Sequence, residues 1–102
     1  MTSLKTVQSQ SYRGDNYWDW EVWLDGLSDE LDEIAFVEYT LHPTFPKPVR
    51  RIVDRASNFK LTTSGWGEFT IYLRVVFKDK REESLSHHLE LFYPDTGART
   101  AL

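Results

Sequence analysis

Strict alternation of apolar and polar side chains is the feature that most limits how this chain can fold. In the segment 69–77 every second residue is apolar, namely Phe69, Ile71, Leu73, Val75 and Phe77. A period of two is typical of a strand with one buried face, because successive side chains point to opposite sides of a sheet. No stretch of ten or more residues keeps the 3.6-residue period of an amphipathic helix. The sequence therefore predicts an all-β fold.

Further strand-like segments follow one another at short intervals. They cover residues 18–24, 34–41, 49–53, 59–62 and 85–91, with a turn at Asp25-Gly26 and a long proline-containing connection over residues 42–58. Short strands joined by turns, with one long loop, indicate an antiparallel β-sandwich of about seven or eight strands. A long connection in a compact domain is often functional.

Length and composition are those of one small domain with a sizeable core. The chain has 102 residues, and aromatic residues make up 15% of them. Such a length fits a single domain, and disordered chains are poor in aromatic residues. We expect residues 1–13 to be a flexible lead-in or an edge strand, residues 14–93 to form the sandwich, and residues 94–102 to be a C-terminal tail.

Composition also excludes several classes of function. The absence of cysteine rules out disulfides, cysteine-based metal centres and thiol nucleophiles. A net charge of −4 is unlike that of a protein that follows nucleic-acid phosphates with a basic face. No apolar run is long enough to span a membrane, and residues 1–10 lack the apolar core of a signal peptide. We expect no direct nucleic-acid or membrane partner, and a cytoplasmic location, or a nuclear one in a eukaryote.

Two polar clusters do not predict a metal site. His87 and His88 are neighbours on a predicted strand, so one side chain points inward and the other outward. The acidic Ser28–Glu33 segment lacks the ligand spacing and central glycine of a calcium loop, and fits a single helical turn or a solvated loop. No nucleophile–base pair is visible. We expect no metal, no cofactor and no catalytic residue.

Two loops carry aromatic residues at the ends of predicted strands. The first is Leu41-His42-Pro43-Thr44-Phe45, and the second is Gly65-Trp66-Gly67-Glu68-Phe69. Aromatic side chains on loops expose apolar surface unless they have a partner. Glycine or a small polar residue beside each of them leaves the backbone accessible. The two loops are therefore candidates for a binding site, with Phe69 facing the core and Glu68 a solvated charge.

The motifs around these loops resemble the YEATS domain family, from about Tyr17 to Phe92. One motif is VEYTLHPTFPKPVR, residues 37–50, and the other is SGWGEFTIYLRVVF, residues 64–77. The closing segment SHHLELF, residues 86–92, is also similar to the family's last strand. The segment Asp54–Phe59 stands where eukaryotic members carry a proline-proline-aromatic step, which makes the chain most similar to the prokaryotic branch. The resemblance implies an immunoglobulin-like β-sandwich.

The resemblance also implies a ligand and a set of contacts. Characterised eukaryotic members read acetylated and crotonylated lysine. Phe45 and Trp66 would then hold the flat acyl amide between their rings, Thr44 would donate a hydrogen bond to its carbonyl, and the backbone N–H of Trp66 would be a second donor. His42 would orient Thr44, Phe69 would line the inner end, and Tyr17 or Trp18 would supply an outer aromatic. The implied ligand-binding residues are His42, Thr44, Phe45, Gly65, Trp66, Gly67 and Phe69.

The sequence leaves two other binding functions open. A prokaryotic member could instead be a sensing or adaptor module, in signalling or defence, with a different ligand or partner. A methyl-lysine cage could be formed through cation–π contacts from Trp66, Phe45 and a nearby aromatic residue, together with Glu68. For the acyl-lysine reader the expected partner is an acylated-lysine peptide or protein. Because the family's readers are parts of larger proteins, we expect this domain to be part of a larger multidomain protein. An acidic surface would also attract a basic peptide.

Overall fold

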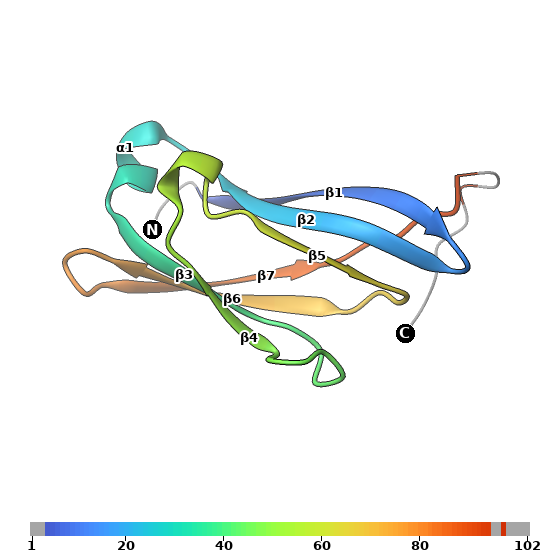
Figure 1. Ribbon diagram of the computed structural model, residues 1–102. Helices are drawn as coiled ribbons and strands as arrows, with labels where there is room; N and C mark the ends of the chain where they lie inside the picture. The colour runs from blue at the N-terminus through green and yellow to red at the C-terminus, as the bar shows by residue number, and fades with distance from the viewer. Residues whose placement is uncertain (1–3, 95–96, 98–102) are drawn as a thin grey trace.

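The computed structural model describes residues 4–94 and 97 as two antiparallel sheets packed face to face (Figure 1). One sheet has the order β1-β2-β5 and the other β4-β3-β6-β7. The strands are β1 Lys5–Gly14, β2 Tyr17–Asp25, β3 Ile34–Thr40, β4 Val49–Ile52, β5 Leu61–Gly65, β6 Thr70–Phe77 and β7 Glu82–His88. Two short helical segments, α1 Ser28–Asp32 and the 3-10 turn η1 Arg55–Ser57, lie in connections between the sheets. The predicted immunoglobulin-like β-sandwich is confirmed.

The core lies between the sheets and is formed by the residues that alternate inward. On β2 these are Trp18, Trp20, Val22 and Leu24, and on β6 they are Ile71, Leu73, Val75 and Phe77, all buried. The intervening residues are half-buried or exposed. Period-two alternation therefore identified the inner face of both central strands correctly.

The polar N-terminal segment forms the ten-residue edge strand β1, paired with β2 from Lys5 opposite Asp25 to Gly14 opposite Tyr17. Its glutamines bind the backbone of the segment that follows β7. Gln8 Nε2 donates to the Glu90 carbonyl at 2.7 Å, and Gln8 Oε1 accepts the Glu90 N–H at 2.9 Å. Gln10 Oε1 accepts the Phe92 N–H at 2.8 Å. These side chains thus bind backbone groups of Glu90 and Phe92 in the way that a neighbouring strand would. An apolar residue in their place would leave those groups without a hydrogen bond.

Some strand ends differ from the sequence-based expectation. The predicted strand 59–62 begins at Leu61, because Asn58 and Phe59 have φ angles of 59° and 60° and turn the chain. The Tyr39 hydroxyl holds this turn by donating to the Phe59 carbonyl at 2.6 Å, and burial raises the pKa of that phenol. The last strand ends at His88 rather than extending to residue 91. The expected tail, residues 94–102, lies mostly outside the described residues.

Three connections meet at one end of the sandwich, on the right in Figure 1. They are the β1–β2 hairpin, the β3–β4 loop and the β5–β6 connection, which crosses from one sheet to the other. The register agrees with this view, since Trp18 at the start of β2 lies opposite Gly65 at the end of β5. Both predicted binding loops are therefore at the same end. The helices within residues 4–94 and 97 are too short and polar to cross a lipid bilayer.

Candidate functional site

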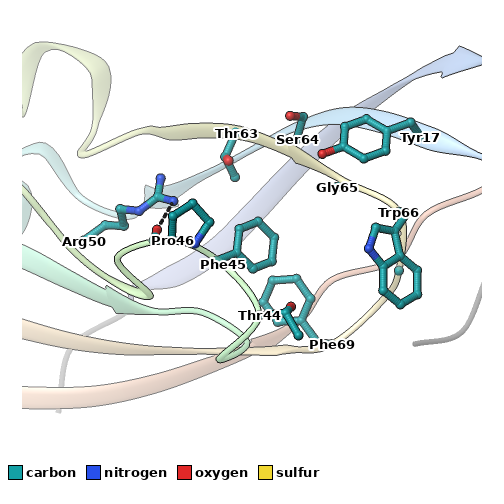
Figure 2. A pocket seen from close by; sticks show the side chains of 11 residues that line it. Tyr17, Thr44, Phe45, Pro46, Arg50, Thr63, Ser64, Gly65, Trp66 and Phe69 are labelled. Carbon is teal, nitrogen blue, oxygen red and sulfur yellow. Dashed lines mark hydrogen bonds between the residues drawn. The ribbon is translucent and has the colours of Figure 1, made fainter.

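A cavity of about 260 Å³ opens between the two predicted binding loops (Figure 2). Six of the seven residues expected to bind a ligand line it: Thr44, Phe45, Gly65, Trp66, Gly67 and Phe69. The seventh, His42, does not line the cavity but contacts Thr44. Tyr17, Pro46, Arg50, Thr63 and Ser64 complete the wall. The fold thus brings the two sequence motifs together around one opening.

The β3–β4 loop presents Thr44 and Phe45 from a hydrogen-bonded turn. The Phe45 N–H donates to the His42 carbonyl at 3.0 Å, which places Pro43 at the second position of a four-residue turn, where proline is favoured. The Leu41 N–H donates to the Pro48 carbonyl at 2.7 Å and closes the loop at its base. The proline-rich segment is therefore an ordered loop with its own hydrogen bonds.

Arg50 holds the second half of this loop, and sequence reasoning missed it. Its Nε donates to the Lys47 carbonyl at 2.8 Å. Its Nη2 donates to the Pro46 carbonyl at 3.0 Å (Figure 2). Lys47 has a φ of 52° although it precedes Pro48, and the helical regions are disfavoured before a proline. The guanidinium therefore stabilises a costly backbone conformation beside the cavity.

His42 and Thr44 form a pair in which the direction of the hydrogen bonds can be deduced. Nδ1 of His42 lies 2.9 Å from the Thr44 hydroxyl and accepts the Thr44 backbone N–H at 3.3 Å. A backbone N–H can only donate, so Nδ1 carries no proton when both contacts are made. The hydroxyl then donates to Nδ1 and presents its lone pairs to the cavity. In this arrangement the group it can bind there is an N–H, not the carbonyl expected from sequence.

Aromatic rings form the wall of the cavity and the layer beneath it. Phe45 packs on Phe69 with ring centroids 5.3 Å apart, and both lie edge-on to Trp20, at 6.2 and 5.9 Å. Trp66, by contrast, is 52% exposed. Figure 2 shows Phe45 and Trp66 on opposite sides of the opening, with Tyr17 near Trp66. Phe45 is thus anchored on the core, whereas Trp66 is an outer wall open to solvent.

Of the two candidates for an outer aromatic, Tyr17 lies at the cavity and Trp18 does not. Tyr17 is 37% exposed and lines the cavity. Trp18 is fully buried between Tyr12 and Tyr93, with both centroid distances at 4.9 Å, and its Nε1 donates to the Phe92 carbonyl at 2.9 Å. The alternation of β2 could have decided this, because Trp18 has the same parity as the inward residues Trp20 and Val22.

A narrow gap separates Gly65 from the rings beneath the cavity. A Cβ added at Gly65 would lie 3.3 Å from Cζ of Phe45 and 3.6 Å from Nε1 of Trp20. That indole nitrogen is buried and, among side chains of the described residues, is the one buried polar atom without a hydrogen-bond partner. Glycine at position 65 therefore sets how close Phe45 lies to β5.

We predict that Gly65→Ala weakens ligand binding because the new methyl group would push Phe45 into the cavity. Overpacking of this kind costs about 1–3 kcal/mol, and we expect part of it to appear as a roughly threefold or greater loss of affinity for an acetyl-lysine peptide. Calorimetric titration measures the affinity, and the NMR shifts of the Phe45 ring report the displacement. Unchanged affinity together with unchanged Phe45 shifts would contradict this prediction.

Glu68 is a correction to the sequence analysis, which expected a solvated charge. It is 7% exposed, and its Oε2 accepts the Leu91 N–H at 2.9 Å. Its Oε1 lies 3.5 Å from Nε2 of His88. The carboxylate therefore ties the β5–β6 connection to the segment after β7, and it is not among the cavity-lining residues. Burial of a charged group is offset here by a hydrogen bond to the backbone and a nearby imidazole.

Removing this carboxylate is expected to lower stability. Glu68→Ala leaves the buried Leu91 N–H without its acceptor, which costs about 1–3 kcal/mol. For a domain of about this size, 1 kcal/mol corresponds to a melting-temperature shift of roughly 4–8 °C. Thermal unfolding followed by circular dichroism provides the measurement. Glu83→Ala, on the half-buried side of β7, is the comparison, and an equal effect of the two changes would argue against a specific role for Glu68.

The two neighbouring histidines point to opposite sides, as predicted. His87 is half-buried, its Nε2 lies 2.8 Å from Oε1 of Gln8, and burial lowers its pKa. His88 is exposed beside Glu68. Within the described part of the chain, no group of three or more histidine and acidic side chains is arranged to hold a metal ion.

Comparison with known proteins places this architecture in a family. The model of the prokaryotic YEATS domain family matches residues 18–90, which include both loops. A curated relative, the protein AF-9 homolog of Eremothecium gossypii, is 40% identical over 79 residues, covering 71% of this chain and 36% of that protein. The chain thus spans about a third of the length of that relative.

Solved YEATS domains have the same fold. The Yaf9 YEATS domain bound to H3K27ac superposes with a TM-score of 0.67 at 24% identity, covering 98% of this chain and 82% of that one. The Yaf9 YEATS domain recognizing an H3K122suc peptide gives a TM-score of 0.64 at 25% identity, covering 98% and 81%. With the family match extending over residues 18–90 and the loops in their expected places, this chain belongs to the prokaryotic YEATS domain family.

Proposed function

We propose that this domain is a non-catalytic reader that binds acylated lysine, such as acetyl- or crotonyl-lysine, in the cavity between the β3–β4 and β5–β6 loops. One observation carries the proposal: two aromatic rings, Phe45 and Trp66, lie on opposite sides of an opening that also contains the Thr44 hydroxyl (Figure 2). Family membership supports it, as does the succinylated peptide that a 25%-identical YEATS domain recognizes.

The chemistry of the cavity suits a neutral, flat group. Acylation removes the lysine charge and creates a planar amide, which stacks on aromatic rings with a gain of about 0.5–1.5 kcal/mol beyond burial. An ammonium would be desolvated without a carboxylate, because no acidic residue is among those lining the cavity. Arg50, the one charged residue in that wall, would repel it further. Unmodified lysine is therefore expected to bind far more weakly than acyl-lysine.

The same observations argue against the methyl-lysine cage. That alternative required Glu68 as a counter-ion, and Glu68 is turned toward Leu91 and His88 instead. A trimethylated ammonium would meet the Arg50 guanidinium in the cavity wall without a compensating charge. A sensing or adaptor role, in signalling or defence, with a different ligand or partner stays compatible with the same cavity.

In the proposed complex, Thr44 binds the N–H of the lysine amide. With His42 Nδ1 unprotonated, the Thr44 hydroxyl donates its proton to that nitrogen, so the hydroxyl oxygen accepts from the ligand. The backbone N–H of Trp66 remains our proposed donor to the acyl carbonyl, Phe69 lines the inner end, and Gly65 and Gly67 keep the strand end narrow. Each neutral hydrogen bond contributes about 0.5–1.5 kcal/mol net. Sums of this size give micromolar affinity at best.

Titration with a matched peptide set tests the proposal. Four peptides with the same uncharged flanking residues, carrying acetyl-, crotonyl-, trimethyl- or unmodified lysine, would be titrated into the domain and followed by calorimetry and by NMR. The proposed reader binds the two acylated peptides and not the unmodified one. A preference for trimethyl-lysine, or the absence of any acyl-lysine shift at millimolar peptide, would overturn it.

We predict that Thr44→Val lowers affinity for the acetyl-lysine peptide by roughly two- to tenfold, because one net hydrogen bond of about 0.5–1.5 kcal/mol is lost. Thr44 is exposed, so the free energy of unfolding should change little. Thr62→Val is the matched control, an exposed threonine on β5 whose hydroxyl contacts Glu21 outside the cavity. Equal affinities for the wild type and Thr44→Val would remove Thr44 from the proposed site.

The location of the protein also remains a proposal. We place it in the cytoplasm, or in the nucleus of a eukaryote, in keeping with a modified protein as its partner. Fluorescence microscopy of the full-length protein, tagged at either end, would test this directly. Enrichment at a membrane would contradict it.

A further inference from the structure

The end of the β1–β2 hairpin, which places Tyr17 in the cavity wall, has little support from the sheet. Trp18, opposite Gly65, is the last residue of β2 toward the hairpin turn that pairs with β5. Among the described strands, the pairing partner of Tyr17 is Gly14 of β1 alone. A two-stranded ribbon is only marginally stable by itself. The position of Tyr17 therefore depends on contacts other than strand pairing.

The backbone of this hairpin end is also costly to form. Asp15 and Asn16, the two residues between the strands, have φ angles of 56° and 57°. Positive φ at both central residues is what a tight type I′ hairpin turn requires, and most residues other than glycine adopt it at a cost. The pairing shifts register between Tyr12 and Gly14, so Arg13 is the extra residue of a β-bulge. A costly turn beside a bulge needs further contacts to keep one conformation.

Two tyrosine hydroxyl groups hold Asn16. The Tyr12 hydroxyl accepts the Asn16 backbone N–H at 3.0 Å. The Tyr93 hydroxyl donates to Oδ1 of Asn16 at 2.6 Å, although the two residues are 77 positions apart in the chain. The Tyr93 ring is itself fixed, with its centroid 4.9 Å from that of Trp18 and 5.5 Å from that of Tyr12. Its hydroxyl thus ties the residue before Tyr17 to the segment after β7.

Arg13 contacts the Tyr17 ring, but from within the same hairpin. Its guanidinium carbon lies 5.8 Å from the ring centroid, and its Nε lies 3.5 Å from a carboxylate oxygen of Asp19. The Arg13 and Asp19 side chains are 54% and 55% exposed, so their contacts are screened and weak. Arg13, Asp19 and Tyr12 all belong to the hairpin. Of these contacts with the hairpin end, only the hydrogen bond from Tyr93 comes from another part of the chain.

We propose that Tyr93 is a positioning residue for the ligand. Through its hydrogen bond to Asn16 it holds Tyr17 in the cavity wall, where the Tyr17 ring contacts the side chain of the acylated lysine. This rests on the proposed function, in which the lysine passes between Tyr17 and Trp66, neighbours in Figure 2. Asn16, Tyr17 and Tyr93 lie outside residues 18–90, which the family model matches. The family match therefore does not include this hydrogen bond.

Removal of one hydroxyl group tests this role. Tyr93→Phe deletes the donor and keeps the ring that packs on Trp18. We expect affinity for the acetyl-lysine peptide to fall roughly two- to fivefold, and NMR contacts between the lysine side chain and the Tyr17 ring to weaken. Asn16→Gly deletes the acceptor, and glycine adopts the required positive φ readily, so it should cause the same loss. The two changes together should lose no more affinity than either alone, because they break one hydrogen bond.

A double-mutant cycle with Tyr17 separates positioning from a general structural role. Tyr17→Ala should lower affinity about five- to tenfold. In that background Tyr93→Phe should have no further effect, because the ring that it positions is gone. A structural role of Tyr93 would instead lower affinity equally with and without the Tyr17 ring. Tyr72→Phe is the control, since it removes a hydroxyl from an exposed tyrosine outside the cavity wall, and it should bind like the wild type.

The outcomes distinguish this proposal from the function on which it rests. If acetyl-lysine binds but Tyr17→Ala or Tyr93→Phe binds like the wild type, the reader function stands and the positioning role is wrong. Equal losses from Tyr93→Phe in both backgrounds would overturn the positioning role as well. If no acylated peptide binds to the wild type, both proposals fall. Should Tyr93→Phe not fold, Asn16→Gly in the two backgrounds decides.

Discussion

Trp66→Ala should lower affinity for an acetyl-lysine peptide at least tenfold, a loss of about 1.4 kcal/mol or more, while leaving the domain folded. Aromatic residues that close a binding pocket commonly cost about 2 kcal/mol or more when truncated to alanine. Trp66 forms the outer wall opposite Phe45, so its loss opens one face of the amide to water. Calorimetric titration of wild type and variant gives the two affinities.

Stability should be nearly unaffected by this change because the indole is 52% exposed. Substitutions at such positions usually alter the free energy of unfolding by no more than about 0.5 kcal/mol. Tyr72→Ala is the matched control, since Tyr72 is another exposed aromatic residue, 60% exposed on β6 and outside the cavity wall. If Trp66→Ala and Tyr72→Ala bind acetyl-lysine equally well, Trp66 is not a wall of the binding site.

Unlike Trp66→Ala, Trp18→Ala is expected to cause a large loss of stability. Replacing a fully buried tryptophan by alanine typically costs about 3–5 kcal/mol, a large part of the roughly 5–15 kcal/mol that stabilises a domain. The change removes the contacts with the Tyr12 and Tyr93 rings and the hydrogen bond to the Phe92 carbonyl. It therefore weakens the attachment of the segment after β7 to the β1–β2 hairpin, which the hydrogen bonds of Gln8 and Gln10 still hold. Urea unfolding measures the loss.

The same strand supplies the control. Trp23 lies on the outer face of β2, half-buried, with the Lys60 ammonium 4.9 Å from its ring centroid. Trp23→Ala should cost less than about 1 kcal/mol, since a partly exposed cation–π contact contributes little more than that. Similar losses in Trp18→Ala and Trp23→Ala would mean that the inward and outward faces of β2 have been wrongly assigned.

Where burial alternates along a strand, the sequence was sufficient to predict the structure. β2 and β6 carry large apolar residues at every second position, so the hydrophobic effect alone selects their inner face. β1 was harder, because Gln8 and Gln10 are polar and still face the interior side. They bind backbone groups more than 80 residues away, at Glu90 and Phe92, and no local pattern encodes such a partner.

In the candidate site, too, some residues could be predicted from the sequence and others could not. Phe45 and Trp66 stood out because loop aromatics have no role in strand alternation, and the structure brings both to one cavity. Glu68 was misjudged because its burial depends on the chain crossing at Leu91, which is distant in sequence. Arg50 was overlooked because it lies within the short strand β4. The signal that could have found it is the preceding run Pro46-Lys47-Pro48, whose carbonyls need donors from elsewhere.

The most direct measurement is the position of the acyl group itself. An acetyl-lysine peptide labelled in its acetyl methyl group, bound to the domain at saturation, would be examined for intermolecular NMR contacts. The proposed function predicts contacts from that methyl group to the rings of Phe45, Phe69 and Trp66, and from the lysine side chain to Tyr17. A methyl group that contacts none of these rings in a saturated complex would show that acyl-lysine, if bound, is read elsewhere on the molecule.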